Sequence, residues 1–337
     1  MSTTDPHHLY ASGRARSEGE PMSTTYDRGL HDLGDGVSAW LLPDGSWGWS
    51  NAGLVRGDGE SLLFDTLFDL PLTREMLDAM APLTETAPIR HLVNSHANGD
   101  HCFGNELVPA EATVYAGTDF THHLHEASPA VLQSMMESDY GPVGTAYLQR
   151  WFGPFTFTGI SVREPEVTVD TSLTVDVGGR DVELLMLGPA HTASDLVAWV
   201  PDAGVLFAGD LLFLGGAPIV WAGPAAAWID ACDRMIALDP RHVVPGHGPV
   251  TDTDGIREVR SYLEFVRDYA AETFQAGMGW REAADRIDLA SFDSLDNSER
   301  IIANLYTEYR HLDPETPQQG LPELIVGMAE WDAARSR

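Results

Sequence analysis

The sequence predicts a mixed α/β (α+β) fold, a four-layer αββα sandwich that carries a helical C-terminal extension. Short apolar runs typical of strands recur from about residue 37 to residue 250, with helical segments between them. These strands and helices do not alternate regularly, which argues against a doubly wound parallel sheet. Residues 253–311 are mostly helical in pattern, and they follow the last predicted strand.

The first half of the chain contains the clearest local signals. The segment GDGE at 57–60 separates two apolar runs and predicts a hairpin turn. Residues 72–83, LTREMLDAMAPL, are amphipathic at helical spacing. Residues 90–96, RHLVNSH, predict a short strand that ends where the polar residues begin, and residues 118–150 are expected to be helical and irregular.

The second half begins with further short strands and ends in helices. Strands are predicted within 161–170, 172–187 and 194–210. A helix is expected at 225–238, and it leads into the strand HVVPGH at 242–247. Functional side chains are commonly presented at the ends of such strands.

The domain organisation follows from the absence of a Pro/Gly/Ser-rich linker in the sequence. We expect one catalytic domain over 22–252 and a helical extension over 253–337 that packs on it. The tetrapeptide MSTT occurs at Met1 and again at Met22, with a polar stretch between. Residues 1–21 are predicted to be a disordered tail, and the choice between Met1 and Met22 as the true start stays open.

Composition limits the partners. The formal net charge is −31, from 51 acidic and 20 basic residues, which disfavours nucleic acid and anionic membrane surfaces. A small-molecule substrate is expected, and a homo-oligomer stays open. Two cysteines and no signal-peptide pattern favour the cytoplasm. No apolar run approaches the roughly 18 residues of a membrane span.

Five places along the chain put a His or an Asp at the end of an apolar run. They are Asp65 in LLFDT, the cluster His96, Asn98, Asp100 and His101 in HLVNSHANGDH, His191 in LGPAHTASD, Asp210 in VLFAGD and His247 in VVPGHG. A strand followed by a turn fixes the backbone and exposes the side chain, so these segments are suited to build one metal site. Imidazole and carboxylate ligands suit Zn²⁺, with iron and manganese as competitors.

The order and spacing of these residues resemble the metallo-β-lactamase superfamily, whose hallmark is H-x-H-x-D-H followed by a later His, Asp and His. The resemblance covers residues 37 to 250 and implies the αββα fold. Carried over by position, it implies that His96 and His191 belong to a first metal site and that Asp210 bridges two sites. The second site would hold Asp100, His101 and His247, and Asp65 would support the ligand loop by hydrogen bonds.

The departure from this motif is Asn98, which stands where the family has its second histidine. An amide oxygen is neutral and binds zinc more weakly than imidazole does. The second site loses no ligand. We therefore expect one tightly bound Zn²⁺ at the second site, with a second ion weak or absent and Asn98 at most a weak ligand.

A zinc-dependent hydrolase that attacks an ester, thioester or lactone carbonyl is the leading prediction. A metal lowers the pKa of bound water to about 7 and polarises a carbonyl. Asp100 or Asp210 is expected to accept a proton, and His191 to stabilise the developing oxyanion.

Within the superfamily, SHANGDHCFGN resembles an actinobacterial branch that includes aromatic polyketide cyclase-thioesterases. That resemblance implies a bulky, planar substrate. Six aromatic residues are candidates to line its pocket: Trp47, Trp49, Trp151, Phe152, Phe155 and Phe157.

Two other classes of function stay open. One is a mononuclear iron oxygenase of the same fold, which would depend on the first site, and the other is a non-catalytic binding module. The histidines His122, His123 and His125 in THHLHE are expected to form a partly exposed cap over the cleft rather than a second metal site. Cys102 directly follows a predicted ligand and is expected to be a buried, inert thiol.

Overall fold

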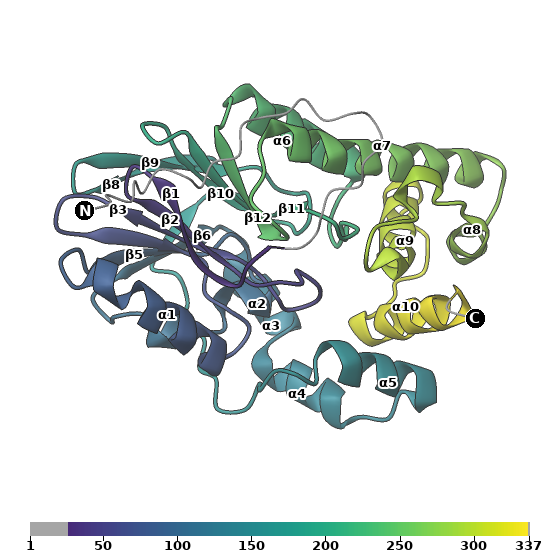
Figure 1. Ribbon diagram of the computed structural model, residues 1–337. Coiled ribbons are helices and arrows are strands. Elements are labelled where there is room, and N and C mark those ends of the chain that lie inside the picture. Colours follow the sequence, from purple (N-terminus) through teal and green to yellow (C-terminus); the bar gives the residue numbers. More distant parts are fainter. Residues whose placement is uncertain (1–25, 336–337) are drawn as a thin grey trace, which may run out of the picture.

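The computed structural model describes residues 26–335 and arranges them as two β-sheets packed face to face between helices (Figure 1). This confirms the predicted four-layer αββα sandwich. The predicted tail, residues 1–21, lies outside the described residues.

The first sheet is mixed. In spatial order its strands are β1 (Gly29–Gly34), β2 (Val37–Leu41), β3 (Ala52–Arg56), β4 (Ser61–Phe64), β5 (Ile89–Val93), β6 (Thr113–Gly117) and β7 (Val167–Val169). The strands from β1 to β4 pair antiparallel, and those from β4 to β7 pair parallel. The hairpin predicted at 57–60 joins β3 to β4.

The second sheet is mainly antiparallel. In spatial order its strands are β12 (His242–His247), β11 (Val205–Phe213), β10 (Leu196–Val200), β9 (Arg180–Met186) and β8 (Ser172–Val177). Only β11 and β12 pair parallel. Because parallel neighbours end at the same edge, β11 and β12 bring their carboxyl-terminal residues together.

An apolar layer fills the space between the two sheets. Phe64 of β4 stacks on Phe207 of β11, with ring centroids 5.5 Å apart. Gly53 of β3 makes room for this pair, because a Cβ at Gly53 would lie 2.0 Å from the Phe207 ring. Burying such rings is the main driving force that holds one sheet against the other.

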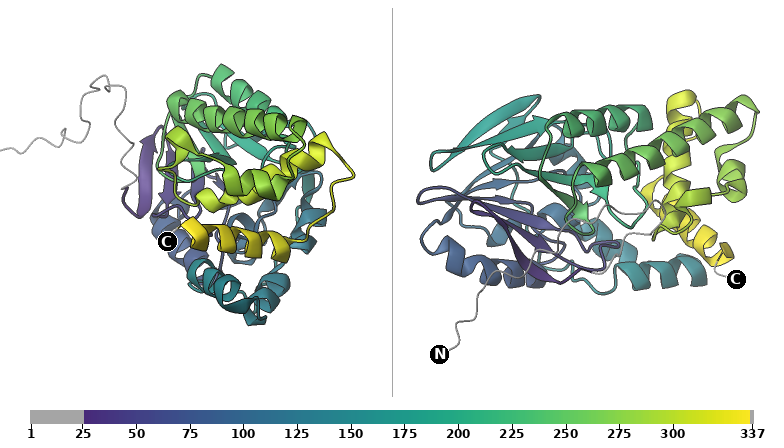
Figure 2. Two further views of the ribbon diagram at one scale, coloured as in Figure 1. Left: turned by 90° about the vertical axis from the view of Figure 1, so that its right-hand side faces the viewer. Right: turned by 45° about the horizontal axis from the view of Figure 1, so that its top comes forward.

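Helices cover both outer faces (Figures 1 and 2). Around the first sheet and the site lie α1 (Leu70–Thr84), α2 (Gly99–Cys102), η1 (Asn105–Leu107), α3 (Phe120–Glu126), α4 (Pro129–Glu137) and α5 (Gly141–Trp151). The second sheet is covered by α6 (Ala225–Ala237), whose Trp228 donates its indole N–H to the Leu211 carbonyl of β11 at 3.1 Å. Both helices predicted from periodicity, at 72–83 and 225–238, are confirmed within a few residues at their ends.

The C-terminal region is helical, as predicted. It contains α7 (Thr253–Gln275), α8 (Trp280–Arg286), η2 (Ala290–Phe292), η3 (Ser298–Arg300), α9 (Ile301–Leu312) and α10 (Leu321–Arg335). Arg150 of α5 lies 3.8 Å from Asp332 of α10, so the last helix reaches a helix from the middle of the chain (Figure 1). Within residues 26–335, no helix is long and apolar enough to cross a membrane.

Candidate metal centre

Five segments bring their polar side chains to one buried point. His96 lies in the loop after β5, Asp100 and His101 lie on α2, and His191 lies between β9 and β10. His247 ends β12, whereas Asp210 lies inside β11, which continues to Phe213 instead of ending as expected from the sequence. All six side chains are almost fully buried.

Asp210 lies at the centre of the cluster. Its Oδ1 is 3.0 Å from His101 Nε2 and 3.4 Å from His247 Nε2. Its Oδ2 is 3.4 Å from His191 Nε2 and 3.8 Å from His96 Nε2. One carboxylate oxygen therefore faces each pair of imidazoles, an arrangement that suits a bridging ligand.

Asp100 lies beside only one of these pairs. Its Oδ2 is 3.3 Å from His247 Nε2 and 3.8 Å from His101 Nε2. Two overlapping groups of ligand atoms could hold a metal ion: His96, His101 and Asp210 form one, and Asp100, His101 and His247 form the other, with the atoms of each group within 4.8 Å of one another.

Several of these atoms are buried and have no hydrogen-bond partner outside the cluster. They are His96 Nε2, His101 Nε2 and Asp210 Oδ1. An unpaired buried polar atom destabilises the fold by roughly 1–3 kcal/mol, so a cluster of such atoms aimed at one point indicates a ligand. Imidazole nitrogens and carboxylate oxygens are the donors that Zn²⁺ prefers, and the residues present therefore fit a metal ion.

Asp65 holds the loop that carries these ligands. Its carboxylate accepts hydrogen bonds from Ser95 N and Ser95 Oγ, both at 2.7 Å, and lies 2.9 Å from His101 Nδ1. Since Nδ1 of His101 faces Asp65, Nε2 is the nitrogen left to face the site. Asp65 has a φ of 62°, a left-handed conformation that Asp tolerates better than most residues do.

Gly246 allows β12 to approach the cluster. A Cβ at this position would lie 1.9 Å from Asp210 Oδ1. No other residue type fits without displacing the carboxylate, so the glycine before His247 is required by the close approach of backbone to ligand.

The histidines of the cluster fall into two groups, one with a lowered pKa and one with a raised pKa. Burial lowers the pKa of His96 well below its usual value and that of His191 to about 4. Burial also opposes the charged form of His101, but the carboxylates of Asp210, Asp100 and Asp65 outweigh it and raise the pKa well above the usual value. The imidazoles of His96 and His191 are therefore neutral at neutral pH. Asp210 and Asp100 likewise outweigh burial and raise the pKa of His247. A bound metal ion would displace the protons from His101 and His247.

Asn98 contacts His191 directly. His191 Nδ1 lies 2.7 Å from the Ile219 carbonyl oxygen, which can only accept, so Nδ1 carries the hydrogen. Because His191 is neutral, Nε2 has a free lone pair, and the Asn98 amide nitrogen 3.1 Å away donates to it. In this tautomer His191 has no N–H to offer an oxyanion, which argues against the oxyanion role predicted for His191.

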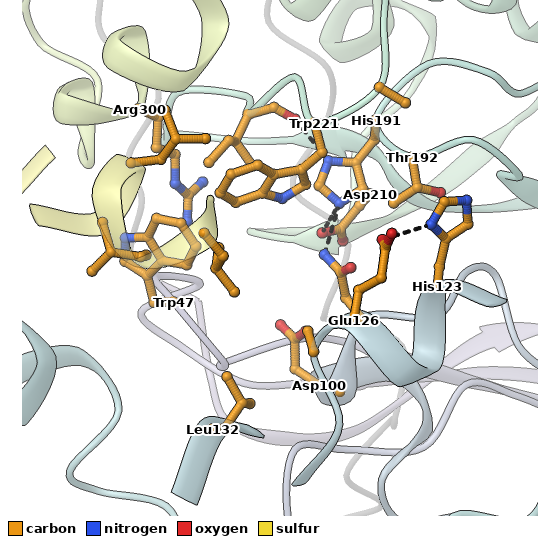
Figure 3. A pocket seen from close by; sticks show the side chains of 18 of the residues that line it. Trp47, Asp100, His123, Glu126, Leu132, His191, Thr192, Asp210, Trp221 and Arg300 are labelled. Atoms are coloured by element: carbon orange, nitrogen blue, oxygen red, sulfur yellow. Dashed lines mark hydrogen bonds and ion pairs between the residues drawn. The ribbon is translucent and has the colours of Figure 1, made fainter. Parts of the chain in front are cut away.

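A cavity of about 690 Å³ opens above the cluster (Figure 3). Asn98, Asp100, His191, Asp210 and His247 lie at its floor. Its walls come from the loop at Trp47, from α3 to α5, and from α9 and α10 of the C-terminal region. Part of the cavity wall therefore comes from α9 and α10, which lie far from the ligand residues in sequence.

The six candidate pocket aromatics divide into two groups. Trp47, Phe152 and Phe157 line the cavity, as predicted. Trp49, Trp151 and Phe155 do not line it, and this part of the prediction is wrong. Phe155 instead packs in the core against Trp49 and Phe68, with centroids 4.9 and 4.8 Å apart.

The histidine-rich helix α3 borders the cavity through one histidine only. His123 and Glu126 line the cavity and lie 3.0 Å apart, whereas His122 and His125 are exposed and do not. Cys102 is fully buried, and burial raises the pKa of its thiol well above the usual value, as an inert cysteine requires.

Sequence reasoning missed the part of the site that comes from the C-terminal region. Arg300 and Trp221 line the cavity, and Glu299 supports Trp47 by accepting its indole N–H at 3.2 Å. Arg300 lies in the polar run DNSER before an apolar helix, a pattern shared by many solvated helix starts. No local signal in the sequence distinguishes it.

Comparisons with known proteins agree with this geometry. A family model described as the metallo-beta-lactamase superfamily matches residues 45–247. A type 2 metallo-beta-lactamase from Bacteroides fragilis is 31% identical over 114 residues, which cover 32% of this chain and 45% of that protein. The match thus spans less than half the length of that curated relative.

Solved structures show the same fold at low identity. A stereoselective inverting sec-alkylsulfatase from Pseudomonas sp. matches with a TM-score of 0.65 and 20% identity, over 88% of this chain and 51% of that one. A metallo-beta-lactamase from Pontibacter korlensis matches with a TM-score of 0.50 and 21% identity, over 70% of this chain and 98% of that one.

Proposed function

The chain belongs to the metallo-beta-lactamase superfamily, and on that premise we propose that it is a zinc-dependent hydrolase that attacks the carbonyl of an ester, thioester or lactone. One observation carries the proposal: imidazole and carboxylate atoms with no hydrogen-bond partner outside the cluster converge at the floor of a cavity large enough for a substrate.

Asp100, His101, His247 and Asp210 would hold the ion, because each directs a ligand atom to the same side of the cluster. When bound, Zn²⁺ supplies a water with a pKa of about 7 and polarises a carbonyl. His96 and His191 form the other side, where Asn98 donates to the His191 lone pair. That hydrogen bond competes with metal binding and supports a weak or absent second ion.

Asp100 is the better of the two carboxylates to accept a proton. Its side chain is 12% exposed and lines the cavity, whereas that of Asp210 is 4% exposed and faces four imidazoles. Asn98 replaces His191 as the candidate oxyanion donor, since its amide has a second N–H and lines the cavity.

The finer proposal is a polyketide cyclase-thioesterase. A cavity of about 690 Å³ with Trp47, Phe152 and Trp221 in its walls suits a bulky, planar acyl chain. Ring closure and thioester hydrolysis would both use a polarised carbonyl at the cavity floor.

A hydrolysis screen tests the proposal. The purified protein is offered acyl thioesters, lactones, aryl esters, a β-lactam and, because of the sulfatase neighbour, a secondary alkyl sulfate. We expect turnover of at least one carbonyl substrate, loss of that turnover on chelation and recovery with added Zn²⁺. Turnover that survives chelation, or cleavage of the sulfate alone, would refute carbonyl hydrolysis by a zinc enzyme.

A further inference from the structure

Arg300 is a buried cation in the wall of the cavity. It lies at the end of η3, directly before α9, and its residue is 1% exposed. It nevertheless lines the cavity, on the opposite side from His123 and Thr192 (Figure 3). A guanidinium stays protonated at neutral pH, so the cavity carries a fixed positive charge.

The guanidinium is held in one orientation. Its Nη1 donates to the Ala217 carbonyl at 2.8 Å. Its central carbon lies 4.4 Å from the ring centroid of Trp47 and 5.0 Å from that of Phe213. These contacts fix a planar donor fork before any ligand arrives, which reduces the entropy lost on binding.

Phe213 relates this cation to the candidate metal centre. Its ring stacks on the His247 imidazole, with centroids 5.1 Å apart and an angle of 4° between the planes. Arg300 and His247 are therefore both neighbours of the Phe213 ring. Both residues line the same cavity of about 690 Å³, a volume within the range of small-molecule sites.

The charge of Arg300 has no directly paired counterion, and the adjacent buried Glu299 carboxylate, with Asp210 and Asp100, stabilises it only at longer range. Among residues 26–335, no carboxylate forms an ion pair with it, and its buried Nε has no hydrogen-bond partner. The neighbouring Glu299 carboxylate instead accepts from Tyr147 Oη at 2.7 Å and from the Trp47 indole. Burying a cation without a direct ion pair is costly even when carboxylates lie nearby, and a purely structural residue at this position would gain from a closer partner.

This half of the cavity has many apolar side chains, although Arg310 and Gln318 of the C-terminal region also line it. Its walls include Leu132 and Met135 of α4, Leu148 of α5, and Leu324 and Ile325 of α10. A ligand that satisfies both the cation and these walls has an oxyanion and an apolar body.

We propose that Arg300 anchors an oxyanionic group, a carboxylate or a sulfate, of an amphipathic substrate whose scissile bond lies over Asp100 and Asp210. The assignment of the scissile bond rests on the proposed hydrolase function. The anion site itself does not, and it is tested by binding alone.

The binding test uses octanoate, octyl sulfate and neutral octanol as probes. Isothermal titration calorimetry is run on the protein as purified, on R300Q and R300M, and on R281Q. Arg281 is the matched control, since its guanidinium lies 4.8 Å from the Trp280 ring but outside this cavity. Metal content is measured in each variant, so that anion binding to a metal cancels in the comparison.

We expect R300Q and R300M to lose roughly 10- to 100-fold in affinity for the two anions relative to octanol, the size of a lost hydrogen bond to a charged group. R281Q keeps the wild-type ratio, and R300K recovers part of it. The better of the two anions identifies the headgroup. An unchanged anion-to-octanol ratio in folded R300Q or R300M overturns the proposal.

A kinetic arm separates this inference from the proposed function. The substrates are 4-nitrophenyl pentanoate and mono-4-nitrophenyl glutarate, which share a chain length and differ by one terminal carboxylate. We expect the kcat/KM ratio of the charged to the neutral ester to fall roughly 10- to 100-fold in R300Q. If wild type cleaves neither ester while the binding difference persists, the hydrolase proposal fails for esters and the anion site stands. If it cleaves both and R300Q keeps the kinetic ratio while its binding ratio falls, the anion site stands and the position of the scissile bond over Asp100 and Asp210 fails.

Discussion

The floor and the outer wall of the cavity are built in opposite ways. The floor consists of buried imidazoles and carboxylates, held by strands and by hydrogen bonds such as those from Ser95 to Asp65. The wall consists mainly of apolar helix faces, with Arg300 as a single buried cation. The floor is suited to general hydrolytic chemistry, and the wall to the choice of substrate. Changes at the floor should therefore affect all substrates, and changes in the wall only some.

The largest effect is expected from removing a ligand at the floor. Asp100→Ala or His247→Ala should lose most bound metal and nearly all activity, on every substrate. Even the loss of a supporting residue commonly costs roughly 10–100-fold. Metal is measured by mass spectrometry and activity by steady-state kinetics, with the exposed Asp181→Ala on β9 as control. Full metal in one of these variants would remove the substituted residue from the proposed ligand set.

The next effect concerns Asn98, which separates the two halves of the floor. Asn98→His should remove the hydrogen bond to His191 Nε2 and supply a third imidazole beside His96 and His191. We expect bound zinc to rise from about one to about two per chain, with lower turnover of the native substrate. Two tightly bound equivalents already present in the wild type would contradict this account of Asn98.

A smaller effect is expected from a residue that supports the wall. Glu299→Ala leaves the Trp47 indole and the Tyr147 hydroxyl without their buried acceptor. We expect a loss of about 2–4 kcal/mol in the free energy of unfolding, measured by chemical denaturation. Metal content should stay at the wild-type value, as should both quantities in the exposed control Glu330→Ala. Loss of metal would show that wall and floor are coupled.

The smallest effect is expected at Cys102, beside the floor but not part of it. Cys102→Ala removes a buried sulfur whose S–H donates to the Asn98 carbonyl at 3.4 Å. A loss of about 1 kcal/mol in the free energy of unfolding is expected, with unchanged metal content. In the folded wild type, neither cysteine should react with a thiol reagent, since Cys232 is buried as well. Rapid labelling would show that the region around α2 opens.

The floor could be predicted from the sequence because its chemistry is local. Asp65, His96 and His247 each follow an apolar run within a few residues, so the strand and its polar end are visible together. The position of Asp210 inside β11 could not be predicted, because Gly209 and Asp210 interrupt the apolar run. The strand nevertheless continues through the apolar residues LLF that follow. The fold class followed from the same periodic runs.

The wall could not be predicted, because its contacts join distant parts of the chain. Trp47 meets Glu299 across 252 positions, and Arg150 of α5 meets Asp332 of α10. Which aromatic residues reach the cavity depends on this packing, so Phe155 entered the core although its neighbour Phe152 lines the cavity. The tautomer of His191 likewise depends on the Ile219 carbonyl, and the hydrophobic pattern of the sequence does not show that this carbonyl lies beside His191.

Because Trp47 pairs with Glu299, which lies late in the chain, the wall of the cavity is completed later in synthesis than the residues of its floor. All six His and Asp residues at the floor are present once residue 247 has been made, whereas Glu299, Arg300 and α10 come later. At about 5–20 residues per second, synthesis of residues 248–335 takes roughly 5–20 s. During that interval a nascent chain has every floor residue but no finished wall, so capacity for metal can precede selectivity for substrate in each new molecule.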